Sequence, residues 1–65
     1  MKLSKDTKHL LNRGIVLRQT NGIEYTITDI VNNGRYTNIT TISNESGTHI
    51  YGMPVSHYYG LEIID

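Results

Sequence analysis

The sequence predicts a single mostly-β domain, a small closed barrel of five short strands preceded by a short N-terminal α-helix. Thr, Ile and Tyr, which favour strands, are abundant, whereas Ala is absent. Short runs of alternating apolar and polar residues are separated by glycine-containing turn sequences. At 65 residues the chain has room for one domain, which we divide into a helix over residues 1–13 and a barrel over residues 14–65.

Residues 1–13 carry the end signals of a short amphipathic helix. Ser4 is a favourable N-cap, and Arg13-Gly14 places a cation and a C′ glycine at the opposite end. A helix of about ten residues does not persist alone in water, so we expect its apolar face to pack on the barrel. That face comprises Leu3, Thr7, Leu10 and Leu11, with Lys5, Lys8 and Asn12 opposite.

Turn sequences divide the rest of the chain into strands. Asn21-Gly22 is a strong hairpin signal, and further turns are expected at 32–34 and 44–47. The apolar alternation of the second strand slips at Asp29, which predicts a β-bulge there. The expected strands are 15–19, 23–31, 36–42, 49–53 and 61–64.

The last third of the chain carries the signals that close the fold. Pro54 cannot donate a backbone hydrogen bond, so the fourth strand ends there or lies at an edge. Residues 56–60 fit one 3₁₀ turn before the final strand. Two of the three histidines and three of the five tyrosines lie in residues 48–64, which makes this segment the main candidate for a functional surface.

Five short strands, three tight hairpins and a 3₁₀ turn before the last strand resemble the SH3-like barrel family over residues 14–65. The resemblance lies in the connectivity. The tryptophan and acidic loop with which SH3 domains hold their ligands are missing here, so binding of proline-rich peptides is not implied. The OB-fold is the alternative, but it usually needs a longer chain and a helix between its third and fourth strands.

The segment Thr48-His49-Ile50-Tyr51 is similar, in its Ile-Tyr pair, to the Val-Gln-Ile-Tyr pore motif of the type II plasmid-borne dihydrofolate reductases. Those short SH3-like chains act as tetramers around a central pore. The valine and glutamine of the motif are not matched, and Gln19 and Thr20 stand where that family has basic residues. The similarity implies that a barrel this small can form a ligand site at a shared interface, and no reductase activity is carried over.

No residue pattern predicts catalysis, so we expect a protein that is not an enzyme. The chain has no cysteine, its carboxylates stand singly, and Ser56 and His57 are neighbours whose side chains diverge. His9, His49 and His57 lack a recurrent ligand spacing, so neither a metal nor a cofactor is predicted. The absence of a long apolar run or a signal-peptide core predicts a cytoplasmic protein without a membrane partner.

We instead expect a binding surface rich in tyrosine, the residue type that often anchors interfaces. Tyr58 and Tyr59 are consecutive on a turn, so they cannot both be buried. Given the small size and the Ile-, Asn- and Tyr-rich composition, we expect this chain to be a phage or mobile-element accessory protein. Its predicted partner is a host defence or replication protein, which it inhibits. The predicted binding residues are His49, Tyr51, His57, Tyr58 and Tyr59, with Lys5 and Lys8 as a second patch.

Two other classes of function stay open. A homo-oligomer could capture a nucleotide-like ligand between barrels, and the zero net charge and small size favour self-association. Residues 1–18 carry five basic side chains and one acidic one, whereas residues 19–65 carry one basic and five acidic. This asymmetry marks either a basic recognition face or two ends that attract each other, and it predicts weak nucleic-acid binding at most.

Overall fold

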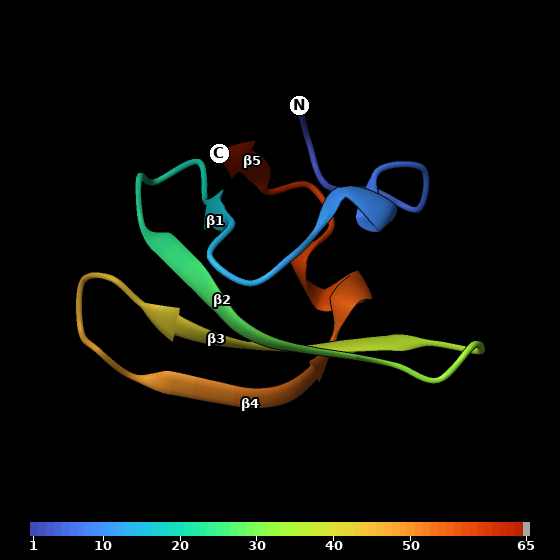
Figure 1. The fold of residues 1–65 in the computed structure, drawn as a ribbon. Coiled ribbons are helices and arrows are strands. Elements are labelled where there is room, and N and C mark those ends of the chain that lie inside the picture. Colours follow the sequence, from blue (N-terminus) through green and yellow to red (C-terminus); the bar gives the residue numbers. More distant parts are fainter. Residues whose placement is uncertain (65) are drawn as a thin grey trace.

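The computed structural model describes residues 1–64 as one five-stranded antiparallel sheet with two 3₁₀ turns (Figure 1). The mostly-β prediction is confirmed; Asp65, the last residue of the predicted barrel, lies outside the described residues. The strands follow the spatial order β4-β3-β2-β1-β5. The elements are η1 (Lys8–Leu10), β1 (Val16–Arg18), β2 (Glu24–Asn32), β3 (Thr37–Ser43), β4 (His49–Pro54), η2 (Val55–Tyr58) and β5 (Glu62–Ile64).

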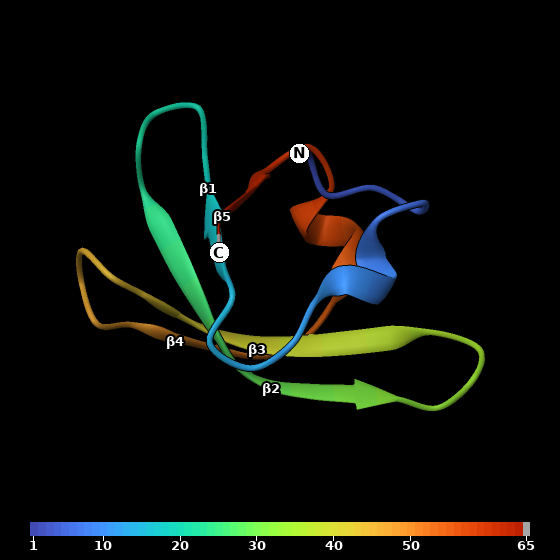
Figure 2. The same ribbon diagram turned by 45° about the horizontal axis from the view of Figure 1, so that its top comes forward.

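The sheet curls around one side but does not close into a ring, which corrects the predicted closed barrel. β4 and β5 form its two edges, and η2 and the N-terminal segment lie over the concave side (Figure 2). Pro54 leads directly into η2. Because the chain turns away from the sheet there, β4 has no continuation that could pair with β5.

The predicted turns and bulge place the strands in register. At the first hairpin the Gly22 amide donates to the Gln19 carbonyl over 2.9 Å, and Gly22 has a φ of +91°, which glycine adopts without steric cost. The predicted bulge is confirmed, because the pairing of β2 with β3 shifts between Ile27 and Asp29. This extra residue bends β2 and sharpens the curl of the sheet.

The predicted N-terminal α-helix is wrong. Residues 1–3 instead pair with the C-terminal strand, since the Leu3 amide donates to the Leu61 carbonyl over 2.7 Å and Lys2 bridges Glu62. Ser4 does begin a turn, but only η1 follows it, and the backbone of Leu11 is extended. Leu3 is 1% exposed and Leu10 is 44% exposed, so the leucines do not share one buried face. Burial of Leu3 with its backbone paired to the C-terminal segment outweighs a helix too short to be stable alone.

The core lies on the concave side of the sheet. Alternate residues of β3 are buried from Thr37 to Ser43, which is the period-2 pattern of a strand with one covered face. The N-terminal segment contributes Leu3 to this core, and η2 contributes its two buried residues from above the sheet. The buried hydrophobic cluster comprises Leu3, Leu17, Ile27, Ile39, Val55 and Tyr58.

Candidate functional site

The sheet separates the predicted binding residues onto two faces. Ile50 of β4 pairs with the buried Thr41 and lines hollows on the concave side. Successive side chains of a strand point to opposite faces, so His49 and Tyr51 lie on the outer, convex face. His57 and Tyr58 come from η2, which lies over the concave side (Figure 2). The predicted cluster is therefore two surfaces.

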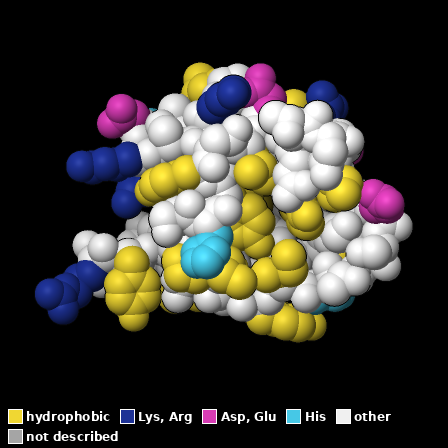
Figure 3. All heavy atoms as spheres, turned by 180° about the vertical axis from the view of Figure 1, so that it is seen from behind, with side chains coloured by type: hydrophobic (Ala, Val, Ile, Leu, Met, Phe, Trp, Pro, Cys, Tyr) yellow, Lys and Arg dark blue, Asp and Glu magenta, His cyan; other side chains and the backbone are white. Residues whose placement is uncertain are grey.

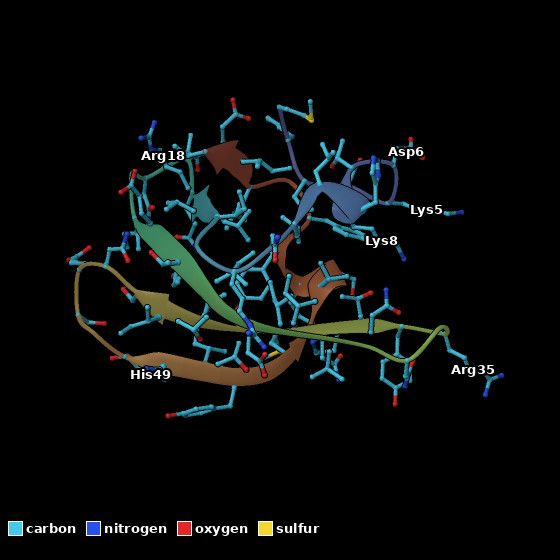
Figure 4. The ribbon with its side chains drawn as sticks, viewed as in Figure 1. Lys5, Asp6, Lys8, Arg18, Arg35 and His49 are labelled. Atoms are coloured by element: carbon cyan, nitrogen blue, oxygen red, sulfur yellow. The ribbon has the colours of Figure 1, made fainter. Side chains whose placement is uncertain are left out.

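On the outer face, His49 and Tyr51 form an exposed stacked pair. Their ring centroids are 5.5 Å apart and the ring planes meet at 11°. Tyr51 is 74% exposed, the highest value among the large hydrophobic side chains of the described residues. Figure 4 places His49 at the start of β4, at the end of the strand far from η2. This pair, which we call the outer aromatic pair, stands on an edge strand.

On the concave side, Tyr58 is a core residue and Tyr59 is not. Tyr58 is 6% exposed, and its hydroxyl lies 3.0 Å from Oγ1 of Thr41. Its ring meets the ring of Tyr25 edge-on, with centroids 6.2 Å apart. Tyr59 is 38% exposed. The two consecutive tyrosines thus divide between interior and surface, and Tyr58 offers a partner only the part of its ring that faces the groove described next.

Two adjoining hollows form a groove on the concave side. The first, about 190 Å³, is lined mainly by apolar and aromatic side chains. The second, about 370 Å³, runs toward the β3–β4 turn, where Glu45, Ser46 and Thr48 line it. Tyr25 and Ile50 line both, so the hollows adjoin, and we call them together the concave groove. The first hollow is lined by Gln19, Tyr25, Ile50, Met53, His57, Tyr58 and Leu61.

Seen from behind, the molecule shows hydrophobic side chains gathered around a hollow beside a histidine (Figure 3). Tyr25, Ile50 and Met53 were not among the predicted binding residues. The alternation of polar and apolar residues in β4 could have indicated Ile50, because it places this side chain on the other face of the strand from His49 and Tyr51. No local signal in the sequence indicated that β2 would bring Tyr25 beside η2.

The predicted basic residues lie on turns and not on a helix face. Two of the arginines are neutralised: Arg13 lies 3.0 Å from Asp29 and Arg18 lies 2.8 Å from Glu24. Within residues 1–64, Lys5, Lys8 and Arg35 make no ion pair. All three point toward the same end of the molecule (Figure 4), which we call the basic end. The 54% exposed Tyr36 follows Arg35 at the β2–β3 hairpin.

The described residues offer no assembled metal centre. In the part of the chain that the structure describes, no three His, Asp or Glu side chains gather as metal ligands. The nucleotide-like ligand and the host partner stay predictions. No helix among residues 1–64 has the length and apolar character needed to cross a membrane.

Comparison of the chain with protein-family models, with curated proteins and with solved structures finds no significant match.

Proposed function

We propose that this protein is a small non-catalytic binding module that accepts a short apolar segment of a partner protein in the concave groove. The observation that carries the proposal is that two hollows on the concave side adjoin and share Tyr25 and Ile50 in their lining. The groove has an apolar, aromatic floor and a polar far end. An extended peptide segment fits such a groove better than a flat protein surface does. Each Leu- or Ile-sized side chain that it buries contributes about 1.5–3 kcal/mol.

The chemistry of the groove favours a peptide over a nucleotide. Among the described residues that line the two hollows there is no Lys or Arg, whereas Glu45 adds a carboxylate to the larger one. A phosphate group would meet no cation there and would approach a like charge.

The wider setting of the proposal rests on connectivity and composition. Five strands with a 3₁₀ turn directly before the last one support the resemblance to SH3-like barrels, a fold class that hosts many binding functions. A cytoplasmic location, a phage or mobile-element origin and inhibition of a host protein stay predictions that rest on the size and composition of the chain.

The test is selection from a displayed library of random peptides on the immobilised protein. We expect enriched peptides to share closely spaced apolar residues, and we expect Ile50→Ser and His57→Glu to weaken their binding. Val31→Ser is the matched control, because Val31 is exposed and lines neither hollow. Enrichment of peptides whose binding is unaffected by both groove substitutions would exclude the groove as the site.

The basic end supports a second candidate function, weak binding of single-stranded nucleic acid. Lys5, Lys8 and Arg35 make no ion pair within residues 1–64, and the exposed ring of Tyr36 is available for base stacking. Anisotropy of a labelled oligonucleotide should then fall steeply with added salt and after substitution of the three cations by glutamine. A salt-independent signal would rule this function out.

A further inference from the structure

The two edges of the sheet are protected unequally. The β5 edge is covered by the N-terminal segment, with hydrogen bonds from the Ile63 amide to the Met1 carbonyl (2.8 Å) and from the Leu3 amide to the Leu61 carbonyl (2.7 Å). β4 is the opposite edge, and no other segment of residues 1–64 pairs with its outer side. An edge strand of six residues exposes unpaired backbone donors and acceptors that can template another strand.

The first half of β4 lacks the usual features that prevent edge pairing. The strand has no Lys, Arg, Asp or Glu. Its protective features lie in the second half: Gly52, with a φ of +56°, stands where the pairing with β3 shifts, and Pro54 has no amide proton. His49, Ile50 and Tyr51 are therefore the segment open to pairing.

The hydrogen-bond pattern fixes how this segment would pair. The Ser43 amide donates to the Thr48 carbonyl over 2.9 Å, so Thr48 directs its backbone toward β3. Along a strand of an antiparallel pair, the backbone amides and carbonyls of successive residues point alternately toward and away from the partner strand. The backbone groups of Ile50 therefore also point toward β3, and those of His49 and Tyr51 point outward. A partner strand would thus bond to His49 and Tyr51.

We propose that the occupant of this edge is β4 of a second copy of the chain, related by a two-fold axis beside Ile50. In that register His49 of each copy lies opposite Tyr51 of the other, and the two Ile50 residues face each other. The outer aromatic pair then becomes a cluster of four rings on one face of a continuous sheet. Such an interface is isologous, because each residue meets the partner that the symmetry requires.

The side chains favour a second copy over an unrelated strand. Aromatic pairs across neighbouring strands stabilise a sheet, and the symmetry provides two of them. Burial of Tyr51 removes from water the most exposed large hydrophobic side chain among those described. The segment is uncharged and the chain has zero net charge, so two copies do not repel each other. Ile50 also lines the concave groove, so the substitution that tests the dimer is made at Tyr51 on the outer face, and its outcome does not depend on the function proposed for the groove.

The test is sedimentation velocity of the full chain over a wide concentration range, combined with isotope-filtered NMR of mixed labelled and unlabelled protein. We expect the mass to rise from one chain to two, with intermolecular contacts between the Ile50 methyl groups. Tyr51→Lys should weaken the association by about tenfold or more, because it places a charge beside the axis in both copies. Val31→Lys is the control, since it adds the same charge to an exposed site on β2.

Thermal melting of both lysine variants establishes that each remains folded. A single-chain mass at every concentration overturns the proposal. So does a dimer whose affinity Tyr51→Lys leaves unchanged, or one whose intermolecular contacts map to residues other than 49–51. A monomer that instead takes up a library peptide along β4 would assign the edge to an unrelated strand and would overturn it as well.

Discussion

The hydroxyl of Tyr58 and Oγ1 of Thr41, 3.0 Å apart, form a buried polar pair between η2 and the middle of β3. Thr41 is fully buried, so each hydroxyl depends on the other for its hydrogen bond inside the core. This contact attaches η2 to the concave side of the sheet and thereby positions the wall of the concave groove.

Tyr58→Phe should lower the free energy of unfolding by about 1–3 kcal/mol, because it leaves the Thr41 hydroxyl buried without a partner. The double variant Tyr58→Phe/Thr41→Val removes both polar groups and should regain part of that loss. Urea unfolding followed by circular dichroism measures both. Equal stability of the single variant and the parent protein would contradict the buried pair.

Leu3→Ala should destabilise the protein by about 2–5 kcal/mol, since it creates a cavity in the core. Leu10→Ala should change stability by less than about 1 kcal/mol, because Leu10 is substantially exposed. Thermal melting of the pair compares two leucines that a helix would have placed on one face. Similar losses for both would restore the helical interpretation of residues 1–13.

Gly52→Ala should cost about 1–2 kcal/mol, because an L-residue with a side chain pays that amount in the left-handed region. No atom lies within 4 Å of an added Cβ, so the cost comes from the backbone and not from a clash. Asn tolerates this conformation better, so Gly52→Asn should be the milder substitution. Chemical denaturation of the two variants checks the order of their stabilities.

Glu24→Gln should have a small effect on stability, below about 1 kcal/mol, because exposed ion pairs contribute little. Glu24 accepts from both Nε and a terminal nitrogen of Arg18, at 2.9 and 2.8 Å. The substitution also removes a charge and leaves Arg18 unpaired. If the melting temperature of the variant lies well below that of the parent protein at low salt and approaches it at high salt, the ion pair has a larger electrostatic role.

The parts of the fold that local sequence determines were predicted well. Asn21-Gly22 turns the chain where the hairpin signal indicated, and the slip of alternation at Asp29 marks a real bulge. Both depend on residues that are neighbours in the chain. The same is true of Pro54, which ends β4 at the predicted position.

The N-terminal segment and the candidate site depend on distant residues, and there the prediction failed or was incomplete. Ser4 and the leucines carried helix signals, but the decisive contact joins Leu3 to Leu61, which is invisible to local periodicity. The density of His and Tyr in residues 48–64 suggested one cluster, although the sheet separates His49 from His57. Sequence alone established that Tyr58 and Tyr59 could not both be buried, but not that Tyr58 would be the inner one.

The pairing of residues 1–3 with the C-terminal strand also has a consequence for the order of folding. The hairpins of β2, β3 and β4 join segments close in the chain and close small loops, whereas the contact of Leu3 with Leu61 closes a loop that spans nearly the whole chain. Since loop closure costs more entropy as the loop grows, we expect the hairpins to form early and the N-terminal contact last. The amide hydrogens of Leu3 and Ile63 should then exchange with solvent through partial opening, whereas those of β3 should exchange only through global unfolding.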